Sequence, residues 1–188
     1  FLLMAATLLY IKSRMLLPKT PAPEPEEWAE EEEIDTREEL VQKLIDRGFK
    51  RFGFLGGLAH TLDNQERFAA FEDTLKRNGI PFDRRYYYHG NYRENSGYQA
   101  AKIMILSHDM PEILVCANDN MAIGAIKAFA EHGIRVPDDI SVTGFDDSET
   151  AMLKGLTTVS IPRYESAYIA AKELLSMING TTSREPFK

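Results

Sequence analysis

The chain has 188 residues, a formal net charge of −7 and a single cysteine, Cys116. The net charge is negative and no basic patch offsets it, so the composition argues against nonspecific and direct binding to the DNA backbone. One cysteine excludes an intramolecular disulfide and is typical of the reducing cytoplasm. The length predicts one domain of about 140 residues together with an accessory segment.

Residues 1–18, FLLMAATLLYIKSRMLLP, have the pattern of an apolar helix. The apolar run covers eleven residues before Lys12, whereas a bilayer span needs about twenty. Positive charge follows the run instead of preceding it, which argues against a signal peptide. We therefore expect a helix that packs against protein and makes no contact with a membrane.

Residues 19–34 are rich in proline and glutamate. The negative charges of the glutamates repel one another, so this composition favours a disordered linker. A helical pattern follows from Glu38 to Arg47. Its apolar positions, Leu40, Leu44 and Ile45, share one side, so we expect them to pack on a sheet.

Between Phe49 and Phe145, four short apolar runs alternate with three helical patterns. This alternation predicts an α/β fold, with a doubly wound, mostly parallel sheet and helices on both of its faces. The expected strands are Lys50–Leu55, Tyr86–His89, Ile113–Ala117 and Ile140–Thr143.

Two of the expected helices begin with recognisable signals. Asp63, with Glu66 three residues later, has the spacing of a capping box. Asn118 precedes a helical stripe that ends near Gly133, where a C-terminal cap is expected. A helix over Ser96–Ser107 is expected between them, from its apolar spacing.

Four polar side chains follow the four expected strands. In open α/β sheets, ligands bind at the carboxyl ends of the strands, so these side chains form a candidate site. An amide, a carboxylate, a guanidinium and an aromatic ring suit a neutral polyol. The residues are Arg67, Tyr92, Asn118 and Asp146.

Each of these residues also has an alternative interpretation that involves no ligand. Asn118 and Asp146 have the residue types of helix and turn caps. Tyr92 is also explained as an ordinary loop aromatic, and Arg67 as a solvated helix residue.

From about Leu44 to Lys188 the chain resembles the effector-binding domain of LacI/GalR transcription regulators. The resemblance lies in an ordered series of motifs: LIDRGFKRFGFLGG, QERFAAFEDTLKRNGI, NYRENSGYQAAKIM, CANDNMAIGAIKAFAEHGIRVPDDISVTGFDD and LTTVSIPRYESAYIAAKELLSMINGT. It implies the periplasmic-binding-protein fold and an effector, a sugar or a purine, that contacts the positions of Arg67, Tyr92, Asn118 and Asp146. It also implies a helix-turn-helix and a first lobe, which this sequence lacks, so we expect a partial domain from residue 35 onward.

Residues 1–45 resemble a different family, the bacterial segregation and condensation protein ScpA, a kleisin of the chromosome-condensing complex. FLLMAATLLYIKSRMLLP, the acidic linker and DTREELVQKLI carry this resemblance. The two resemblances meet between Val41 and Asp46, so the chain has the character of a composite. The second resemblance implies contacts with SMC or kleisin-partner proteins as an alternative function.

The expected function is effector sensing in transcriptional control, without catalysis. The sequence contains no phosphate-binding glycine motif, and its histidines lack metal-ligand spacing, so we expect neither cofactor nor metal. Effector binding is expected to be weak or absent with half of the cleft missing, and a homodimer is compatible with the exposed surfaces. The histidines are His60, His89, His108 and His132.

Overall fold

The computed structural model describes residues 36–161 and 163–179. The apolar helix predicted for residues 1–18 and the linker predicted for residues 19–34 lie outside the described residues. In chain order the elements are α2 (Thr36–Asp46), β1 (Phe52–Gly56), α3 (Leu62–Arg77), η1 (Arg84–Tyr86), β2 (Tyr87–His89), α4 (Glu94–Ser107), β3 (Ile113–Cys116), α5 (Asp119–Glu131), β4 (Ser141–Thr143), α6 (Glu149–Leu153) and α7 (Arg163–Ile178).

The four strands form one parallel sheet in the order β2-β1-β3-β4, which confirms the predicted fold class. Phe54 of β1 lies opposite Tyr87 on one side and Val115 on the other. Every residue of β1 and β3 is buried, as expected for strands that helices cover on both faces. An isolated parallel bridge between Thr143 and Thr157 continues the sheet beyond β4.

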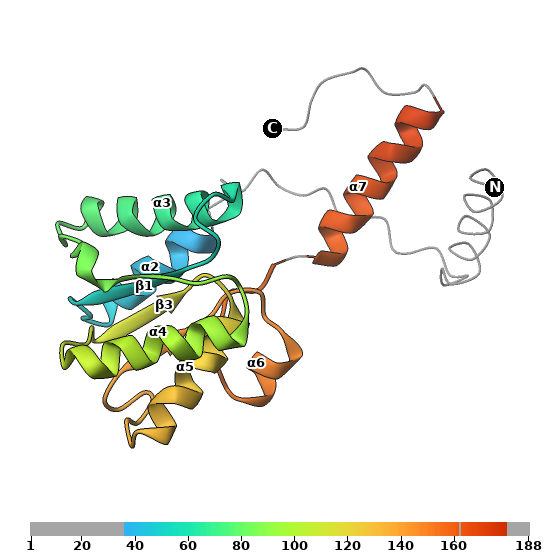
Figure 1. Ribbon diagram of the computed structural model, residues 1–188. Helices are drawn as coiled ribbons and strands as arrows, with labels where there is room; N and C mark the ends of the chain where they lie inside the picture. Colours follow the sequence, from blue (N-terminus) through green and yellow to red (C-terminus); the bar gives the residue numbers. More distant parts are fainter. Residues whose placement is uncertain (1–35, 162, 180–188) are drawn as a thin grey trace. The chain divides into compact units, whose positions relative to one another are not determined.

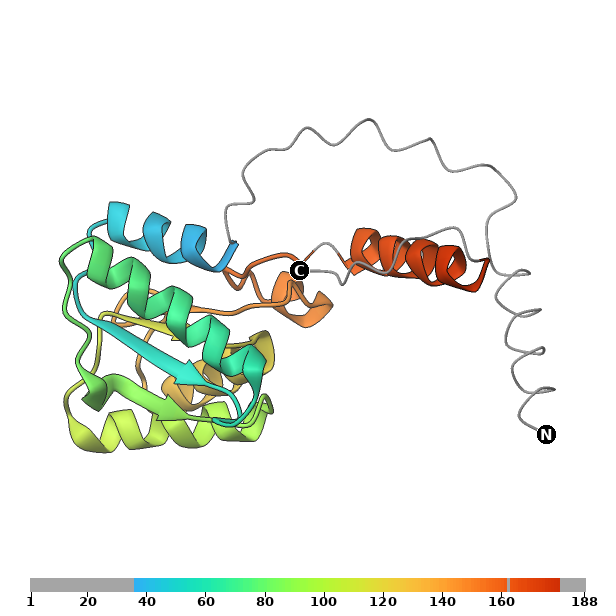
Figure 2. The same cartoon turned by 90° about the horizontal axis from the view of Figure 1, so that it is seen from above.

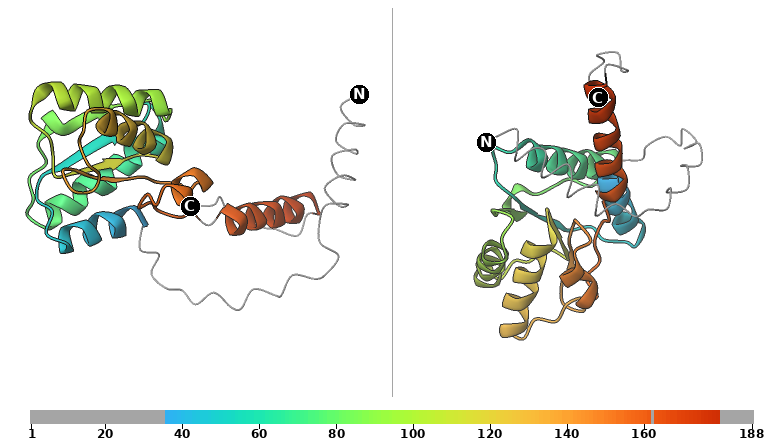
Figure 3. Two further views of the ribbon diagram at one scale, coloured as in Figure 1. Left: turned by 90° about the horizontal axis from the view of Figure 1, so that it is seen from below. Right: turned by 90° about the vertical axis from the view of Figure 1, so that its right-hand side faces the viewer.

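Helices cover the sheet in two layers. Helices α2 and α3 lie on one face, and α4 and α5 lie on the other (Figures 1 and 2). In the view from below, the strands again lie between α2 and α4 (Figure 3, left). Because all four strands run in the same direction, their carboxyl ends meet at one edge of the sheet. We call this side of the domain the carboxyl edge.

An aromatic cluster fills the space between α3 and the sheet. The ring of Phe54, which is 2% exposed, lies 5.0 Å from the ring of Phe71 and 5.1 Å from that of Phe68. Tyr87 of β2 is 4.8 Å from Phe68. These separations are typical of favourable aromatic pairs, so the cluster anchors α3 and holds its first turn at the carboxyl edge.

Helices α4 and α5 approach each other through two glycines. A β-carbon added at Gly97 would overlap the backbone carbonyl of Met121, and one added at Gly124 would overlap that of Glu94. The absence of side chains therefore lets the two backbones pack in direct contact. The buried side of α4 also includes Ala101 and Met104.

Helix α2 packs its apolar side on the domain, as predicted, but with an additional residue. Leu44 is buried, and Leu40 and Ile45 are partly buried against the core. Val41, which was not predicted to be buried, is also only 2% exposed. An ion pair between Glu38 and Arg77 ties α2 to the end of α3.

Helix α7 spans Arg163–Ile178 and follows the last strand-like segment in the described part of the chain. Many of its apolar side chains are exposed to solvent. Within residues 36–161 and 163–179, no helix is long and apolar enough to span a bilayer. The exposed apolar residues of α7 are Tyr164, Tyr168, Ile169, Leu174, Leu175, Met177 and Ile178.

Candidate effector site at the carboxyl edge

The structure brings the four predicted site residues together in one connected network. Arg67 lies in the second turn of α3, Tyr92 in the loop before α4, and Asn118 at the start of α5. Asp146 follows β4. The side chain of Asn118 contacts the backbone of Tyr92, while Arg67 lies near Asp146. The topology explains this gathering, since each residue follows one of the parallel strands.

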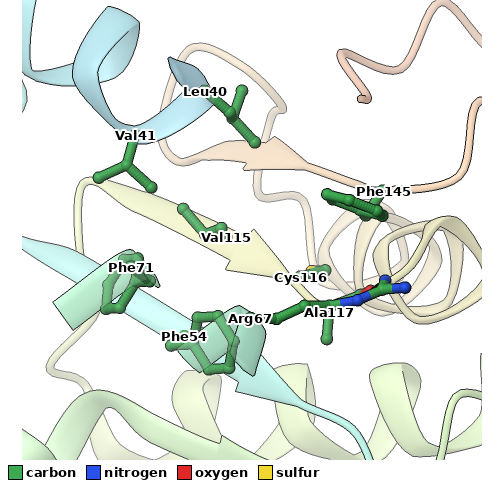
Figure 4. A pocket seen from close by; sticks show the side chains of 9 residues that line it. All are labelled: Leu40, Val41, Phe54, Arg67, Phe71, Val115, Cys116, Ala117 and Phe145. Atoms are coloured by element: carbon green, nitrogen blue, oxygen red, sulfur yellow. Dashed lines mark hydrogen bonds between the residues drawn. The ribbon is translucent and has the colours of Figure 1, made fainter. Parts of the chain in front are cut away.

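The guanidinium of Arg67 is held on several sides and is only 12% exposed. Its Nε donates to Asp63 Oδ1 at 2.9 Å, and its Nη2 lies 2.9 Å from the same oxygen. Nη1 donates to the carbonyl of Ala117, and the group lies 4.0 Å over the ring of Phe145 (Figure 4). Asp146 Oδ1 is 3.8 Å away. The alternative interpretation of Arg67 as a solvated helix residue is therefore wrong.

Tyr92 adopts a left-handed backbone conformation, with φ 64°, which is rare for an aromatic residue. Its hydroxyl donates to Asp63 Oδ2 at 2.9 Å. The ring lies against Gly57, where an added β-carbon would overlap it. Burial raises the pKa of the Tyr92 hydroxyl above its ordinary value, so the group is a proton donor at neutral pH.

Asn118 is a buried helix cap. Its Oδ1 accepts from Met121 N at 3.0 Å, and its Nδ2 donates to the carbonyl of Tyr92 at 3.0 Å. The structural interpretation of this residue is therefore correct. The amide retains one further N–H and one further lone pair, so capping and ligand contact are chemically compatible.

Asp146 and Asp147 both have positive φ angles, 114° and 51°. Non-glycine residues in this region carry backbone strain, and such residues cluster at functional sites. The amide of Asp146 donates to Val159 O at 3.0 Å, which fixes the turn after β4. This turn directs the chain across the end of the sheet beside Arg67.

The capping box predicted for Asp63 and Glu66 is wrong. The cap of α3 is Thr61, whose side chain accepts from the amide of Asn64. Asp63 lies in the first turn, and its carboxylate bridges Arg67 and Tyr92. Sequence reasoning missed this role, although the spacing of Asp63 and Arg67, four residues apart on one helix, indicated the ion pair.

Asp119 is a second residue that sequence reasoning missed. It is 1% exposed, and its carboxylate accepts from Ser148 N at 2.7 Å and from Thr158 Oγ1 at 2.5 Å. The charge is compensated by these donors and by the N-terminus of α5, on which Asp119 lies. It thereby ties α5 to the loop after β4 and supports the position of Asp146.

A small cavity lies behind Arg67, among α2, α3 and the sheet (Figure 4). Its volume is about 20 Å³, room for about one water molecule and too small for a sugar. Cys116 lines this cavity, and burial raises the pKa of its thiol far above its ordinary value, as expected of an inert core thiol. In the described part of the chain, no group of three or more metal-ligating side chains is placed to hold a metal.

Two family models match the chain. The periplasmic binding protein-like domain matches residues 41–187, and the segregation and condensation protein ScpA matches residues 1–78. The chain is 34% identical to the probable HTH-type transcriptional repressor ExuR of Bacillus subtilis (strain 168), over 76% of this chain and 43% of that protein. It is 33% identical to the HTH-type transcriptional regulator AscG of Escherichia coli (strain K12), over 74% of this chain and 42% of that protein. The chain thus spans less than half of these curated relatives.

Solved structures show the same similarity. The crystal structure of the Escherichia coli transcriptional repressor ascG superposes with a TM-score of 0.73 at 32% identity, covering 78% of this chain and 54% of that one. The Lac repressor bound to ONPG gives a TM-score of 0.72 at 29% identity, covering 78% of this chain and 44% of that one. A LacI-family sugar-binding regulator from Escherichia coli, complexed with phosphate, gives 0.74 at 32% identity, over 81% of this chain and 55% of that one.

Proposed function

Because the chain belongs to the family of periplasmic binding protein-like domains and carries the effector-binding domain of LacI-type transcription regulators, we propose that its carboxyl edge binds a sugar or a purine. Members of this regulator family are not enzymes, and the role proposed for this chain is sensing. The proposal includes a cytoplasmic location, which a single buried cysteine suits.

The observation that carries this proposal is the network of Arg67, Tyr92, Asn118 and Asp146 around one sheet edge. Two of these residues hold strained backbone angles, and Asp63 orients two of the side chains. Such an arrangement presents fixed donors and acceptors to a polyol or a purine edge, with the Tyr92 ring available for stacking.

We expect the 188-residue chain to bind sugars or purines only weakly, with a dissociation constant in the millimolar range or above. The described edge is open, so each polar contact competes with water and contributes about 0.5–1.5 kcal/mol. Four contacts of this size barely offset the roughly 4–15 kcal/mol lost when a ligand is immobilised. Amide chemical shifts of the labelled chain, followed while monosaccharides and purine bases are added, measure this binding.

The shifts should be confined to the amides near Tyr92, Asn118 and Asp146, and Asp146→Asn should abolish them. Asparagine tolerates positive φ angles, so this variant removes the charge without breaking the turn. Asp138→Asn, at a well exposed carboxylate, is the matched control and should leave the shifts unchanged. Micromolar binding would show that one open edge suffices, and shifts that lie elsewhere would contradict the proposed site.

A second candidate function comes from the ScpA match, which covers residues 1–78. We propose a division into a kleisin-like helix at residues 1–18, a linker at 19–34 and the effector-binding part from residue 35. In this alternative, residues 1–45 bind an SMC protein or a kleisin partner. A pull-down with the purified chain as bait tests it, and a chain that begins at residue 35 is the control that should lose the partner.

The relatives also suggest partners for the whole regulator. The Lac repressor is described as a dimer bound to operator. For this chain we propose a homodimer. We also propose that it makes no direct DNA contact, because its net charge of −7 disfavours binding to the negatively charged DNA backbone. Sedimentation over a range of concentrations tests the dimer.

A further inference from the structure

Three long helices, α3, α4 and α5, begin at the carboxyl edge. The N-terminus of a helix carries a partial positive charge and unpaired amides, so an edge where several helices begin ordinarily attracts anions. On backbone geometry alone, a carboxylate or phosphate would be the favoured ligand of this site.

The side chains at this edge oppose that preference. Each of the three helices, and the short helix α6, carries a carboxylate in its first turn. These carboxylates offset the helix dipoles, and Asp146 and Asp147 add two further negative charges after β4. The first-turn residues are Asp63, Glu94, Asp119 and Glu149.

The arginine of the site is already neutralised. Two donor nitrogens of Arg67 lie 2.9 Å from Asp63, and Asp146 is 3.8 Å away. An incoming anion would therefore compete with Asp63 and Asp146 for the charge of Arg67. The neighbouring Arg93, at the start of α4, is exposed, so its charge is screened by solvent and salt.

We infer that the carboxyl edge admits uncharged ligands such as neutral sugars and excludes anionic ones, and that Asp63 is the residue that sets this selectivity. The inference rests on the effector site proposed above. Asp63 acts in two ways: its charge repels an anion directly, and its carboxylate engages Nε and Nη2 of Arg67 and the hydroxyl of Tyr92. Because its side chain is 46% exposed, it faces the solution that a ligand would come from.

The test uses amide chemical shifts of the labelled 188-residue chain at neutral pH. Galactose and glucose are the neutral probes, while galacturonate, glucuronate and inorganic phosphate are the anionic probes. The unaltered chain should respond to the anions at least fivefold more weakly than to the parent neutral sugar. Asp63→Asn, which keeps the shape and removes the charge, should strengthen anion binding roughly tenfold.

Asp73→Asn is the matched control, because Asp73 is an exposed carboxylate on the same helix, ten residues from Asp63. It removes the same charge and should leave anion binding as in the unaltered chain. Asp63→Ser serves as an independent replacement if Asp63→Asn disturbs the fold, as judged from shifts far from the edge.

The inference is overturned if the unaltered chain binds anions as strongly as it binds neutral sugars. It is also overturned if Asp63→Asn does not strengthen anion binding. If the unaltered chain does not respond to neutral sugars while Asp63→Asn still gains anion binding, the proposed effector is contradicted. The charge selectivity is then still supported. The two failures are therefore distinguishable in one set of titrations.

Discussion

Replacing Phe54 with alanine is expected to lower the free energy of unfolding by about 3–5 kcal/mol, since removal of a buried aromatic ring leaves a cavity that the surroundings fill only partly. Phe54 is 2% exposed and contacts the rings of Phe68, Phe71 and Tyr87. Chemical denaturation, followed by circular dichroism, measures the change.

Tyr164→Ala is the matched control, because it removes an aromatic ring that is 72% exposed. It should change the free energy of unfolding by no more than about 0.5 kcal/mol. Equal losses for the two variants would contradict the position of Phe54 in the core. A loss for Phe54→Ala below about 1 kcal/mol would mean that the cluster does not anchor α3 to the sheet.

Replacing Gly97 with alanine is expected to destabilise the domain by about 3 kcal/mol, although alanine is the better helix former by about 1 kcal/mol. The added β-carbon would overlap the backbone of Met121, so α4 and α5 would have to separate. A backbone cannot move aside as the end of a flexible side chain can. The sign of the change thus distinguishes a packing contact from intrinsic helix propensity.

Gln99→Ala provides the control for this second variant, since Gln99 is exposed on the same helix. It should be neutral or stabilising, by no more than about 0.5 kcal/mol. Thermal unfolding of both variants measures the difference. A stabilised Gly97→Ala variant would show that the two helices are not in backbone contact.

Much of the fold could be predicted because local signals and tertiary structure agree. The four apolar runs became four parallel strands, and α5 begins after Asn118 as expected. The prediction was less accurate where a surface is shared between helices. Helix α4 begins at Glu94, two residues before Ser96, and it buries Gly97, which no apolar pattern indicates.

The candidate site was predictable in position but not in connectivity. Arg67, Tyr92, Asn118 and Asp146 follow strand ends, which topology alone brings together. Asp63 was assigned to a cap because its role depends on Tyr92, 29 residues away. Asp119 and Thr158 are 39 residues apart, so no local pattern predicted their hydrogen bond. Long-range polar contacts of this kind are set by the fold as a whole.

The two family matches overlap over residues 41–78, and the overlap begins within helix α2. Val41 and Leu44 are buried, and Glu38 reaches Arg77 from the same helix. An α-helix turns by about 100° per residue, so one residue added in the middle of α2 would rotate Glu38 away from Arg77. Helix α2 therefore tolerates substitutions on its exposed side more readily than a change in the number of its residues.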